Sequence, residues 1–231
     1  MGKATSAVEA TSVAGEGEGT WRDRALERSL ATAKAKAISR SDRFIATAME
    51  ILQETGRTDF TVQELVDRSR TSLRSFYQYF SGKDELLLAL MEETIAQSVA
   101  AWRVQIEDQE AMDALKTVAM SIYGGDAPDS GTGSLNRAMA TRRLGLAHSH
   151  SKEYQRAIAP MVRMIRELIE RGVADQVIRK DLPVDRLTAV FTQIVIGSTL
   201  FTGSSEQHAD SDRHADVETM WEFLRKGLAR T

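Results

Sequence analysis

The sequence predicts an all-α protein, and two observations carry that prediction. Only 3 Pro and 15 Gly occur among 231 residues, while the good helix formers Ala, Leu, Arg and Glu are abundant. Apolar residues also recur at the 3.6-residue helical spacing in segment after segment. With 42% hydrophobic residues, the chain is long enough for one large domain or two smaller ones with a core.

The amino-terminal end differs from the rest in composition. Residues 1–20 are mostly Ala, Gly, Ser, Thr and Glu, which predicts disorder. Residues 21–39 are Ala-rich and basic, and both a helical extension and a flexible arm fit them. We therefore predict a disordered or flexible basic extension over residues 1–39.

Four short helices are predicted next, each with its own start or stop signal. Gly56 ends the first, and Thr61 caps the second with Glu64 three residues on, which completes a capping box. Ser72 or Thr71 caps the third. The expected ranges are Ser41 to near Gly56, Thr61 to Arg68, Leu73 to Phe80, and Lys83 to beyond Trp102.

Five further helices are predicted in the remaining chain, separated by polar, Gly-containing loops at 124–134 and 203–210. Their expected ranges are 111–123, 135–147, 152–171, 184–202 and 212–228. The predicted domains are therefore residues 40–86, with the short helices, and residues 87–231, with the longer ones.

Charge is distributed unevenly along the chain. The net charge is −3, yet residues 21–83 hold twelve Lys and Arg against eight Asp and Glu, a net of +4. The rest of the chain then carries −7. A basic segment on an acidic body fits a DNA-reading domain on a regulatory body, and ordinary surface charge fits as well.

Several function classes find no support in the sequence. There is no Cys, hence no disulfide or thiolate metal site. The longest apolar stretch, Leu187–Phe201, is too short and too polar to span a bilayer. No nucleophile elbow, phosphate loop or metal motif appears, and His148, His150, His208 and His214 are expected at the surface. We expect a cytoplasmic protein that is not an enzyme and has no cofactor, metal or membrane partner.

The second and third helices, joined by the turn Ser69-Arg70-Thr71, have the spacing of a helix-turn-helix, which reads the major groove of DNA. Phe76 and Phe80 lie at i and i+4, so they anchor the third helix to the core. Tyr77 is rotated away from them, and its hydroxyl can reach a phosphate, as can that of Tyr79. The alternative for either tyrosine is simple packing with its hydroxyl at the surface.

Polar residues on and beside the third helix are the candidate DNA contacts. Arg74 is the preferred base reader, because Arg pairs with guanine O6 and N7, although Arg also commonly binds phosphate. Arg40 and Arg43 are candidates for the backbone or the minor groove. The full predicted set is Arg40, Arg43, Thr61, Gln63, Ser72, Leu73, Arg74, Ser75, Tyr77, Gln78, Tyr79 and Lys83.

These motifs resemble those of a known family. Phe60-Thr-Val-Gln-Glu-Leu65, Ser72-Leu-Arg-Ser-Phe-Tyr-Gln-Tyr-Phe80 and Lys83-Asp-Glu-Leu-Leu87 look like the amino-terminal domain of TetR-family transcriptional regulators. The match covers residues 41–90. It implies a dimeric all-α repressor whose body binds a ligand and then releases DNA, with Tyr77, Tyr79 and Lys83 at phosphate-contacting positions.

One residue departs from the family pattern. Arg70 stands in the turn where the family commonly has Gly. A left-handed backbone there costs a non-Gly residue roughly 1 kcal/mol. Either the turn avoids that geometry or Arg70 adopts it, and an Arg at this place adds a possible phosphate contact.

The body offers a candidate ligand pocket. Nine Met residues suit an adaptable apolar cavity, although a Met stripe at helical spacing is usually core. We expect a fairly large apolar effector, such as an acyl chain, a sterol-like molecule or a drug. The predicted lining is Met91, Ile95, Trp102, Ile122, Tyr123, Met139, Met161, Met164 and Ile165.

The last two helices offer a candidate dimer interface. Three successive apolar residues, 194–196, make one helix apolar on several sides, which fits a two-fold four-helix interface or a buried helix of a monomer. The predicted interface residues are Phe191, Ile194, Val195, Gly197, Ser198, Trp221 and Leu224. A homodimer of this kind places two recognition helices about one DNA turn apart.

The sequence therefore predicts an amino-terminal three-helix helix-turn-helix DNA-binding domain joined to a carboxy-terminal helical ligand-binding and dimerisation domain. The predicted function is a repressor that binds a palindromic operator in double-stranded DNA and is released by a small apolar effector. Two alternatives stay open: a DNA-binding regulator without a small-molecule ligand, and a helical enzyme or carrier with an apolar cavity.

Overall fold

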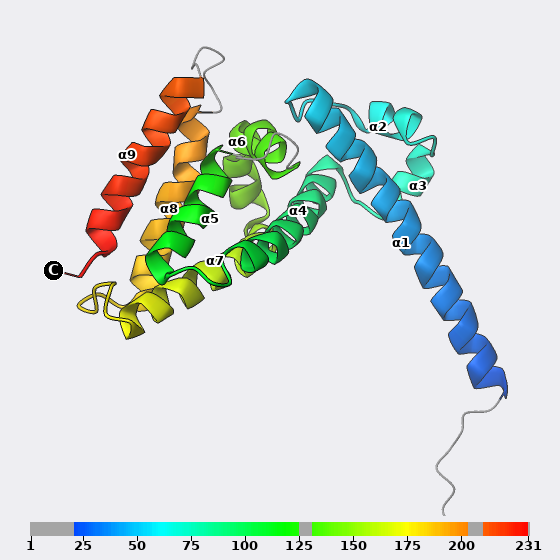
Figure 1. Cartoon of the computed structure of the whole chain (residues 1–231). Helices are drawn as coiled ribbons and strands as arrows, with labels where there is room; N and C mark the ends of the chain where they lie inside the picture. The colour runs from blue at the N-terminus through cyan, green and yellow to red at the C-terminus, as the bar shows by residue number, and fades with distance from the viewer. Residues whose placement is uncertain (1–20, 125–130, 203–209, 231) are drawn as a thin grey trace, which may run out of the picture. The chain divides into compact units, whose positions relative to one another are not determined.

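The computed structural model describes residues 21–124, 131–202 and 210–230 (Figure 1). Within these ranges the regular structure is helical, and the one extended pairing is an isolated antiparallel bridge between Ile178 and Ala229. The all-α prediction is confirmed. The helices are α1 (Trp21–Thr55), α2 (Val62–Arg68), α3 (Leu73–Tyr77), α4 (Lys83–Gln105), α5 (Ala111–Gly124), α6 (Gly131–Ser149), α7 (Ser151–Ala174), α8 (Val184–Thr202) and α9 (Asp210–Leu228).

The first helix is much longer than predicted. It begins at Trp21 rather than Ser41, so the helical alternative describes residues 21–39 and the flexible arm does not. The cause is local: residues 21–55 lack Gly and Pro and are rich in Ala, Leu, Arg, Lys and Glu, so the helix propagates without interruption. Residues up to Arg40 form one compact unit, and residues from Ser41 onward form a second. The predicted disorder of residues 1–20 lies outside the described residues.

The second unit contains a cluster of aromatic and aliphatic side chains around α2, α3 and the part of α1 that follows residue 40. Phe44 is fully buried, with its ring edge against Phe76 at 5.5 Å and against Phe80 at 6.2 Å between centroids. Leu65 and Val66 bury the inner side of α2. The predicted anchoring of the third helix by Phe76 and Phe80 is confirmed.

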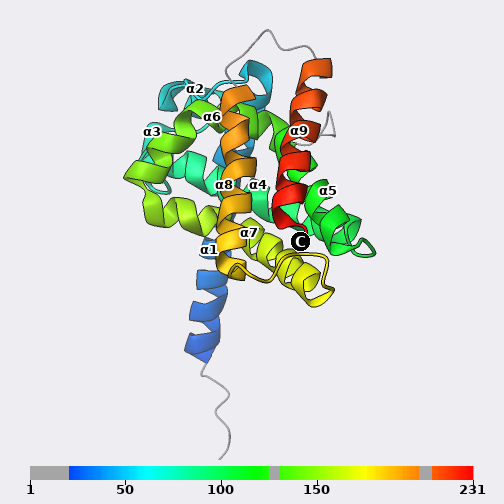
Figure 2. The same ribbon diagram turned by 90° about the vertical axis from the view of Figure 1, so that its left-hand side faces the viewer.

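Helices α4, α5, α7, α8 and α9 contribute a second cluster of buried side chains, while buried residues of α6 join the first. Helix α7 packs along α4, α5 and α8, and α9 packs on α5 and α8. Figures 1 and 2 show α8 and α9 side by side. Near the end of α7, a Cβ built on Gly172 would lie 2.5 Å from Ile178 Cδ1, so any larger residue at this position would require the side chain of Ile178 to move.

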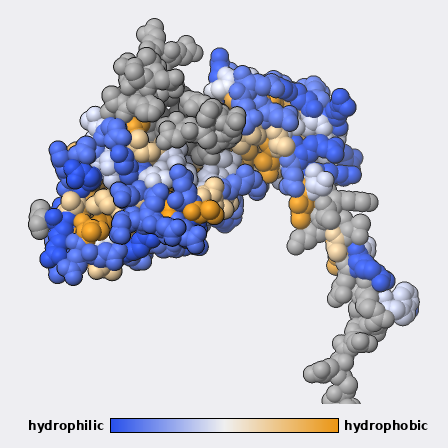
Figure 3. All heavy atoms as spheres, in the orientation of Figure 1, coloured by the Kyte–Doolittle hydropathy of each residue, from blue (hydrophilic) through white to orange (hydrophobic). Residues whose placement is uncertain are grey.

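The surface of the described residues is mostly polar. Outside its grey atoms, the face drawn in Figure 3 is mostly hydrophilic, and its apolar residues form small separate patches. Each helix in the described ranges is too short or too polar to cross a membrane. The same residues hold no group of three or more His, Asp or Glu placed to bind a metal ion.

Candidate nucleic-acid interface and internal cavity

The turn between α2 and α3 adopts the left-handed geometry that Gly usually provides. Arg70 has φ +52°, its N–H donates to Asp67 O at 3.2 Å, and the N–H of Thr71 donates to Val66 O at 2.9 Å. These two bonds are the Schellman motif, with Arg70 at the position where Gly is preferred. Of the two expected alternatives, Arg70 therefore adopts the left-handed conformation. The exposed side chain of Arg70 extends from this turn.

Both short helices start at side-chain caps. Thr61 Oγ1 accepts the N–H of Glu64 at 3.1 Å, and Ser72 Oγ accepts the N–H of Ser75 at 3.2 Å. Gln63 Nε2 donates to Asp67 Oδ1 at 2.9 Å along the exposed side of α2. The three polar side chains thus have structural bonds of their own, and each keeps a donor or an acceptor for another partner.

Helix α3 is shorter than predicted: it ends at Tyr77 and not at Phe80. The N–H of Gln78 already bonds to Ser75 O, an i−3 acceptor, which tightens the last turn. The anchor below it is unaffected, since the N–H of Phe80 still bonds to Phe76 O at 3.0 Å. Gln78 and Tyr79 therefore lie in the turn that follows the helix.

The outer side of α3 presents the predicted contact residues together. Leu73, Arg74 and Gln78 are exposed, Ser75 is half-buried, and Tyr77 is 58% exposed. Tyr79 is half-buried with its ring 6.4 Å from that of Phe44. One short helix and the turn after it therefore combine a guanidinium, an amide, an apolar side chain and a phenol.

The cations of this domain fall into two groups. Arg68 binds both carboxylate oxygens of Glu54, at 2.6 and 2.7 Å, and Arg57 pairs with Asp59. In the described part of the chain, Arg43, Arg70 and Arg74 are exposed and have no ion pair or side-chain hydrogen bond. The exposed residue Arg40 belongs to the amino-terminal unit. Three exposed guanidinium groups in the second unit are therefore available to phosphate or base edges.

Lys83 has a different environment from the one its predicted role implies. Its Nζ donates to Thr58 O at 3.0 Å and to Phe60 O at 2.9 Å, and it lies 5.4 Å from the ring centroid of Phe60. Burial, and then the nearby charge of Arg142, lower the pKa of Lys83. Two of its three N–H groups thus hold the loop before α2 against the start of α4. In this structure the ammonium group of Lys83 therefore has a structural role, with one N–H left for another partner.

The start of α4 is also tied to the body. Arg142 of α6 pairs with the carboxylate of Asp84 through Nε, at 3.2 Å, and through Nη2. His150, at the start of α7, lies 3.9 Å from the other oxygen of Asp84. Adjacent residues in the first turn of α4 therefore contact the loop before α2 on one side and α6 and α7 on the other.

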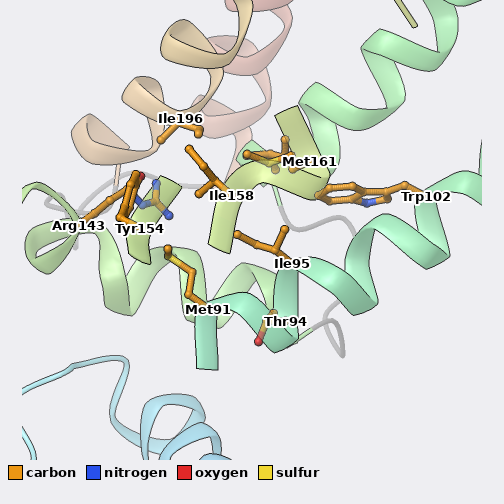
Figure 4. A pocket seen from close by; sticks show the side chains of 10 residues that line it. Met91, Thr94, Ile95, Trp102, Arg143, Tyr154, Ile158, Met161 and Ile196 are labelled. Atoms are coloured by element: carbon orange, nitrogen blue, oxygen red, sulfur yellow. The ribbon is translucent and has the colours of Figure 1, made fainter. Parts of the chain in front are cut away.

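A small cavity lies in the body, between α4, α5, α6, α7 and α8 (Figure 4). Its volume is about 30 Å³, room for about two water molecules. Five of the predicted lining residues are there, and five others complete the wall. The lining consists of Met91, Thr94, Ile95, Trp102, Ile122, Arg143, Tyr154, Ile158, Met161 and Ile196.

Three of the predicted lining residues do not reach this cavity. Met139, Met164 and Ile165 are almost completely buried among other side chains of the core. Their helical spacing reflects packing in the core, which was the alternative to a ligand pocket for these Met and Ile residues. The side chain of Tyr123 lies outside the described ones. The observed wall therefore differs from the predicted one in its residues: α6 contributes Arg143 in place of Met139, and α7 contributes Tyr154 and Ile158 in place of Met164 and Ile165. Thr94 of α4 and Ile196 of α8 are added.

The sequence reasoning missed the two polar residues that distinguish the cavity. Arg143 is only 7% exposed, and Figure 4 shows its side chain beside that of Tyr154, with Trp102 at the other end. Burial lowers the pKa of Arg143 and raises the pKa of Tyr154. A signal existed: Arg143 lies four residues after Met139 and three before Leu146, on one apolar helix face.

The predicted dimer residues are corrected in a similar way. Phe191, Val195, Trp221 and Leu224 are buried within one chain, where they join α8 and α9 to α5 and α7. Ile194 and Gly197 are half-buried, and the side chain of Ser198 lies outside the described ones.

Other apolar side chains are exposed on the same two helices. Val190 is 53% exposed and Phe223 is 68% exposed. They line a surface groove of about 140 Å³ between α8 and α9, together with Leu182, Arg186, Leu187, Phe191, Ile194, Leu224, Gly227 and Leu228.

Comparisons with known proteins agree with this arrangement. Residues 44–90 match the family model described as bacterial regulatory proteins, tetR family. No curated protein sequence matches the chain. Among solved structures, FadR from Bacillus subtilis in complex with stearoyl-CoA is similar, with 18% identity, 80% of this chain and 97% of that chain covered, and a TM-score of 0.65.

Two other solved structures show the same fold. A TetR-family transcriptional regulator from Pectobacterium atrosepticum has 18% identity over 84% of this chain and 96% of that chain, with a TM-score of 0.65. The ketosteroid transcriptional regulator KstR2 of Mycobacterium tuberculosis has 14% identity over 83% and 96%, with a TM-score of 0.53. The family match over residues 44–90 therefore identifies this segment as a helix-turn-helix of the tetR family type, and the likeness to the solved structures shows that the chain shares their fold.

Proposed function

We propose that the protein is a ligand-responsive repressor of transcription, which binds a palindromic DNA operator as a homodimer and leaves it when a small apolar effector binds. The observation that carries the proposal is the exposed side of α3, where Arg74 and Tyr77 are held outward by the buried ring of Phe76. A rigidly anchored short helix with an unpaired guanidinium suits the major groove of DNA.

The DNA contacts proposed for this surface follow from exposure and charge. Arg74 and Gln78 can bond to base edges, and the phenol of Tyr77 can bond to a phosphate. Arg43 and Arg70 add positive charge without an internal carboxylate partner. Such contacts release counterions, so the affinity for DNA should fall steeply with salt.

The proposed dimer forms through the outer sides of α8 and α9. Val190 and Phe223 expose apolar surface there beside an apolar groove. A two-fold contact needs a patch that is complementary to itself, and two antiparallel helices from each chain provide one as a four-helix interface. The proposed interface uses the same two helices as the predicted one, but its contacts are made by exposed residues such as Val190 and Phe223 and not by the buried ones.

The proposed effector site is the cavity lined by Trp102, Arg143 and Tyr154. Its present volume is far below the several hundred Å³ that drug-sized ligands occupy, roughly 300 Å³ or more. An effector must therefore separate α4, α6, α7 and α8, and it would favour the widened conformation. Two similar structures support an apolar effector by their descriptions, since one contains stearoyl-CoA and the other is named a ketosteroid regulator.

The proposal is tested by selecting DNA with the purified protein. Fragments of the genome that encodes it are incubated with the protein at near-physiological salt, and bound fragments are sequenced. We expect enrichment of a few fragments that share an inverted repeat, with half-sites about one helical turn apart. If no fragment is enriched over bulk DNA, the proposal is contradicted and a helical enzyme or carrier becomes the better account.

A further inference from the structure

The cavity contains a charge that an apolar ligand alone does not explain. Arg143 is 7% exposed and forms part of a wall that is otherwise made largely of Met, Ile and Trp side chains. The cavity lining holds no Asp or Glu among the described residues. An interior cation costs free energy because it loses hydration, and proteins keep such groups where they have a use.

The chemistry of the two polar residues is complementary to an oxyanion. The guanidinium of Arg143 stays protonated and carries five N–H donors; it has an interaction within the chain and also forms part of the cavity wall. Tyr154 of α7 contributes an O–H donor, and Figure 4 shows its side chain beside that of Arg143 in the cavity wall. Two converging donors, one of them charged, recognise a carboxylate or a similar planar anion better than any neutral group.

We propose that the effector is an amphipathic anion, with an apolar body and one compact oxyanion group that binds between Arg143 and Tyr154. This inference rests on the proposed effector site and specifies its ligand class. The oxyanion lies at the Arg143 end, and the apolar body extends toward Met161 and Trp102, the direction in which the lining is apolar (Figure 4).

The position of Arg143 also connects such a ligand to DNA binding. Its neighbour in α6, Arg142, pairs with Asp84 in the first turn of α4. An anion that draws Arg143 toward the cavity shifts the same turn of α6, and with it the partner of Asp84. A widened cavity and a displaced α4 are thus coupled through one helical turn.

Two dyes that differ by a single anionic group provide the test. The sulfonate 8-anilinonaphthalene-1-sulfonate and the neutral N-phenyl-1-naphthylamine share one apolar skeleton, and both fluoresce when bound in an apolar site. Each is titrated into wild-type protein without DNA, and decanoate and decan-1-ol are then compared as competitors. Because DNA is absent, the result does not depend on whether the protein is a repressor.

We expect the wild-type protein to bind the sulfonate about tenfold or more tightly than the neutral dye, and decanoate to displace it better than decan-1-ol. Arg143→Met should remove that preference and leave the neutral dye's affinity unchanged. Tyr154→Phe, a change that keeps the ring, should weaken sulfonate binding several-fold. Arg156→Met, an exposed position on α7, is the matched control and should change neither dye.

The outcomes separate recognition from packing. A variant that weakens both dyes equally has disturbed the cavity, which assigns Arg143 a structural role and overturns the inference. Wild-type protein that shows no preference, whether it binds both dyes or neither, overturns it as well. A preference that survives in Arg143→Met and Tyr154→Phe places the anion site elsewhere.

Discussion

Arg142 in α6 forms an ion pair with Asp84 in the first turn of α4, and the residue before Asp84 is bonded to the DNA-binding segment. Lys83 donates to the carbonyl oxygens of Thr58 and Phe60, while Asp84 accepts from the body. These adjacent side chains therefore join the two parts of the second unit at one helical turn. From these contacts we expect a movement of α6 to be passed to the helix-turn-helix through the first turn of α4.

We predict that this ion pair contributes to DNA affinity as well as to stability. In a double-mutant cycle with Asp84→Asn and Arg142→Met, the coupling energy should be about 0.5–1 kcal/mol in unfolding, because the pair is partly exposed. The cycle should also be non-additive in DNA binding. Urea unfolding and fluorescence anisotropy measure the two quantities.

The matched control is the ion pair of Arg103 and Glu167, which joins α4 to α7 far from the first turn of α4. Its cycle should show coupling of similar size in unfolding and additive effects in DNA binding. The prediction fails if the Asp84 and Arg142 changes are strictly additive in their effect on DNA affinity.

The dimer is predicted to depend on exposed residues of α8 and α9. Phe223→Asp and Val190→Asp should shift the protein from dimer to monomer at micromolar concentration, since each places a charge in an apolar interface. Light scattering after size-exclusion chromatography measures the mass. Val104→Asp, at an exposed position on α4, is the control and should stay dimeric. A dimer that survives both changes would require a different interface.

Replacing Arg70 by Gly should stabilise the protein by about 1 kcal/mol, because the left-handed conformation of Arg70 then costs nothing. Gln176, with φ +61°, occupies the same position in the turn after α7. Gln176→Gly should give a smaller rise in melting temperature, because it also removes the hydrogen bond that Gln176 Oε1 accepts from Arg230 at 2.7 Å. Only Arg70→Gly should also weaken DNA binding, since it removes a charge beside α3. Equal DNA affinity for both variants would exclude a DNA contact by Arg70.

We predict that the carboxylate of Glu85 makes the free energy of unfolding depend on pH. It accepts the N–H of Ser81 at 2.6 Å at the start of α4, and this bond lowers the pKa of Glu85. A lowered folded-state pKa means that the stabilisation is complete above the unfolded-state pKa, about 4.3. It is then lost as the pH falls through the folded-state value.

Comparison with Glu85→Gln isolates this contribution. The wild-type protein should exceed the variant by about 0.5 kcal/mol of unfolding free energy at pH 7, and the difference should vanish in acid. Glu92→Gln, at an exposed position later in α4, controls for the loss of one negative charge. A difference that grows as the pH falls would contradict the assignment.

The sequence predicted the parts of the fold that depend on local signals. Thr61 and Glu64 marked the start of α2, and the i, i+4 spacing of Phe76 and Phe80 identified the anchored side of α3. The predicted first residue of α1, Ser41, was wrong. The polar, Ala-rich segment before it has high helix propensity but no apolar face. Propensity alone did not separate a helix from a flexible arm.

Tertiary packing explains the remaining differences. Three successive apolar residues on α8 do not show which face of the helix is buried. Phe191 was therefore assigned to the dimer interface, although it is buried and its neighbour Val190 is exposed. Arg143 was not singled out in the sequence, where it simply follows Arg142, and only its spacing from Met139 and Leu146 on one helix face indicates the buried position. The bonds of Lys83 to two loop carbonyls have no sequence pattern at all.

The most direct measurement of the central claim is an anisotropy titration of the selected operator fragment at several salt concentrations. It compares wild type, Arg74→Ala, Tyr77→Phe and the control Arg103→Ala. The account predicts that Arg74→Ala loses about 1–3 kcal/mol of operator affinity and most sequence preference. Tyr77→Phe should weaken all DNA more uniformly, and Arg103→Ala should match wild type. Equal operator affinity for wild type, Arg74→Ala and Tyr77→Phe would contradict the claim that the exposed side of α3 reads DNA.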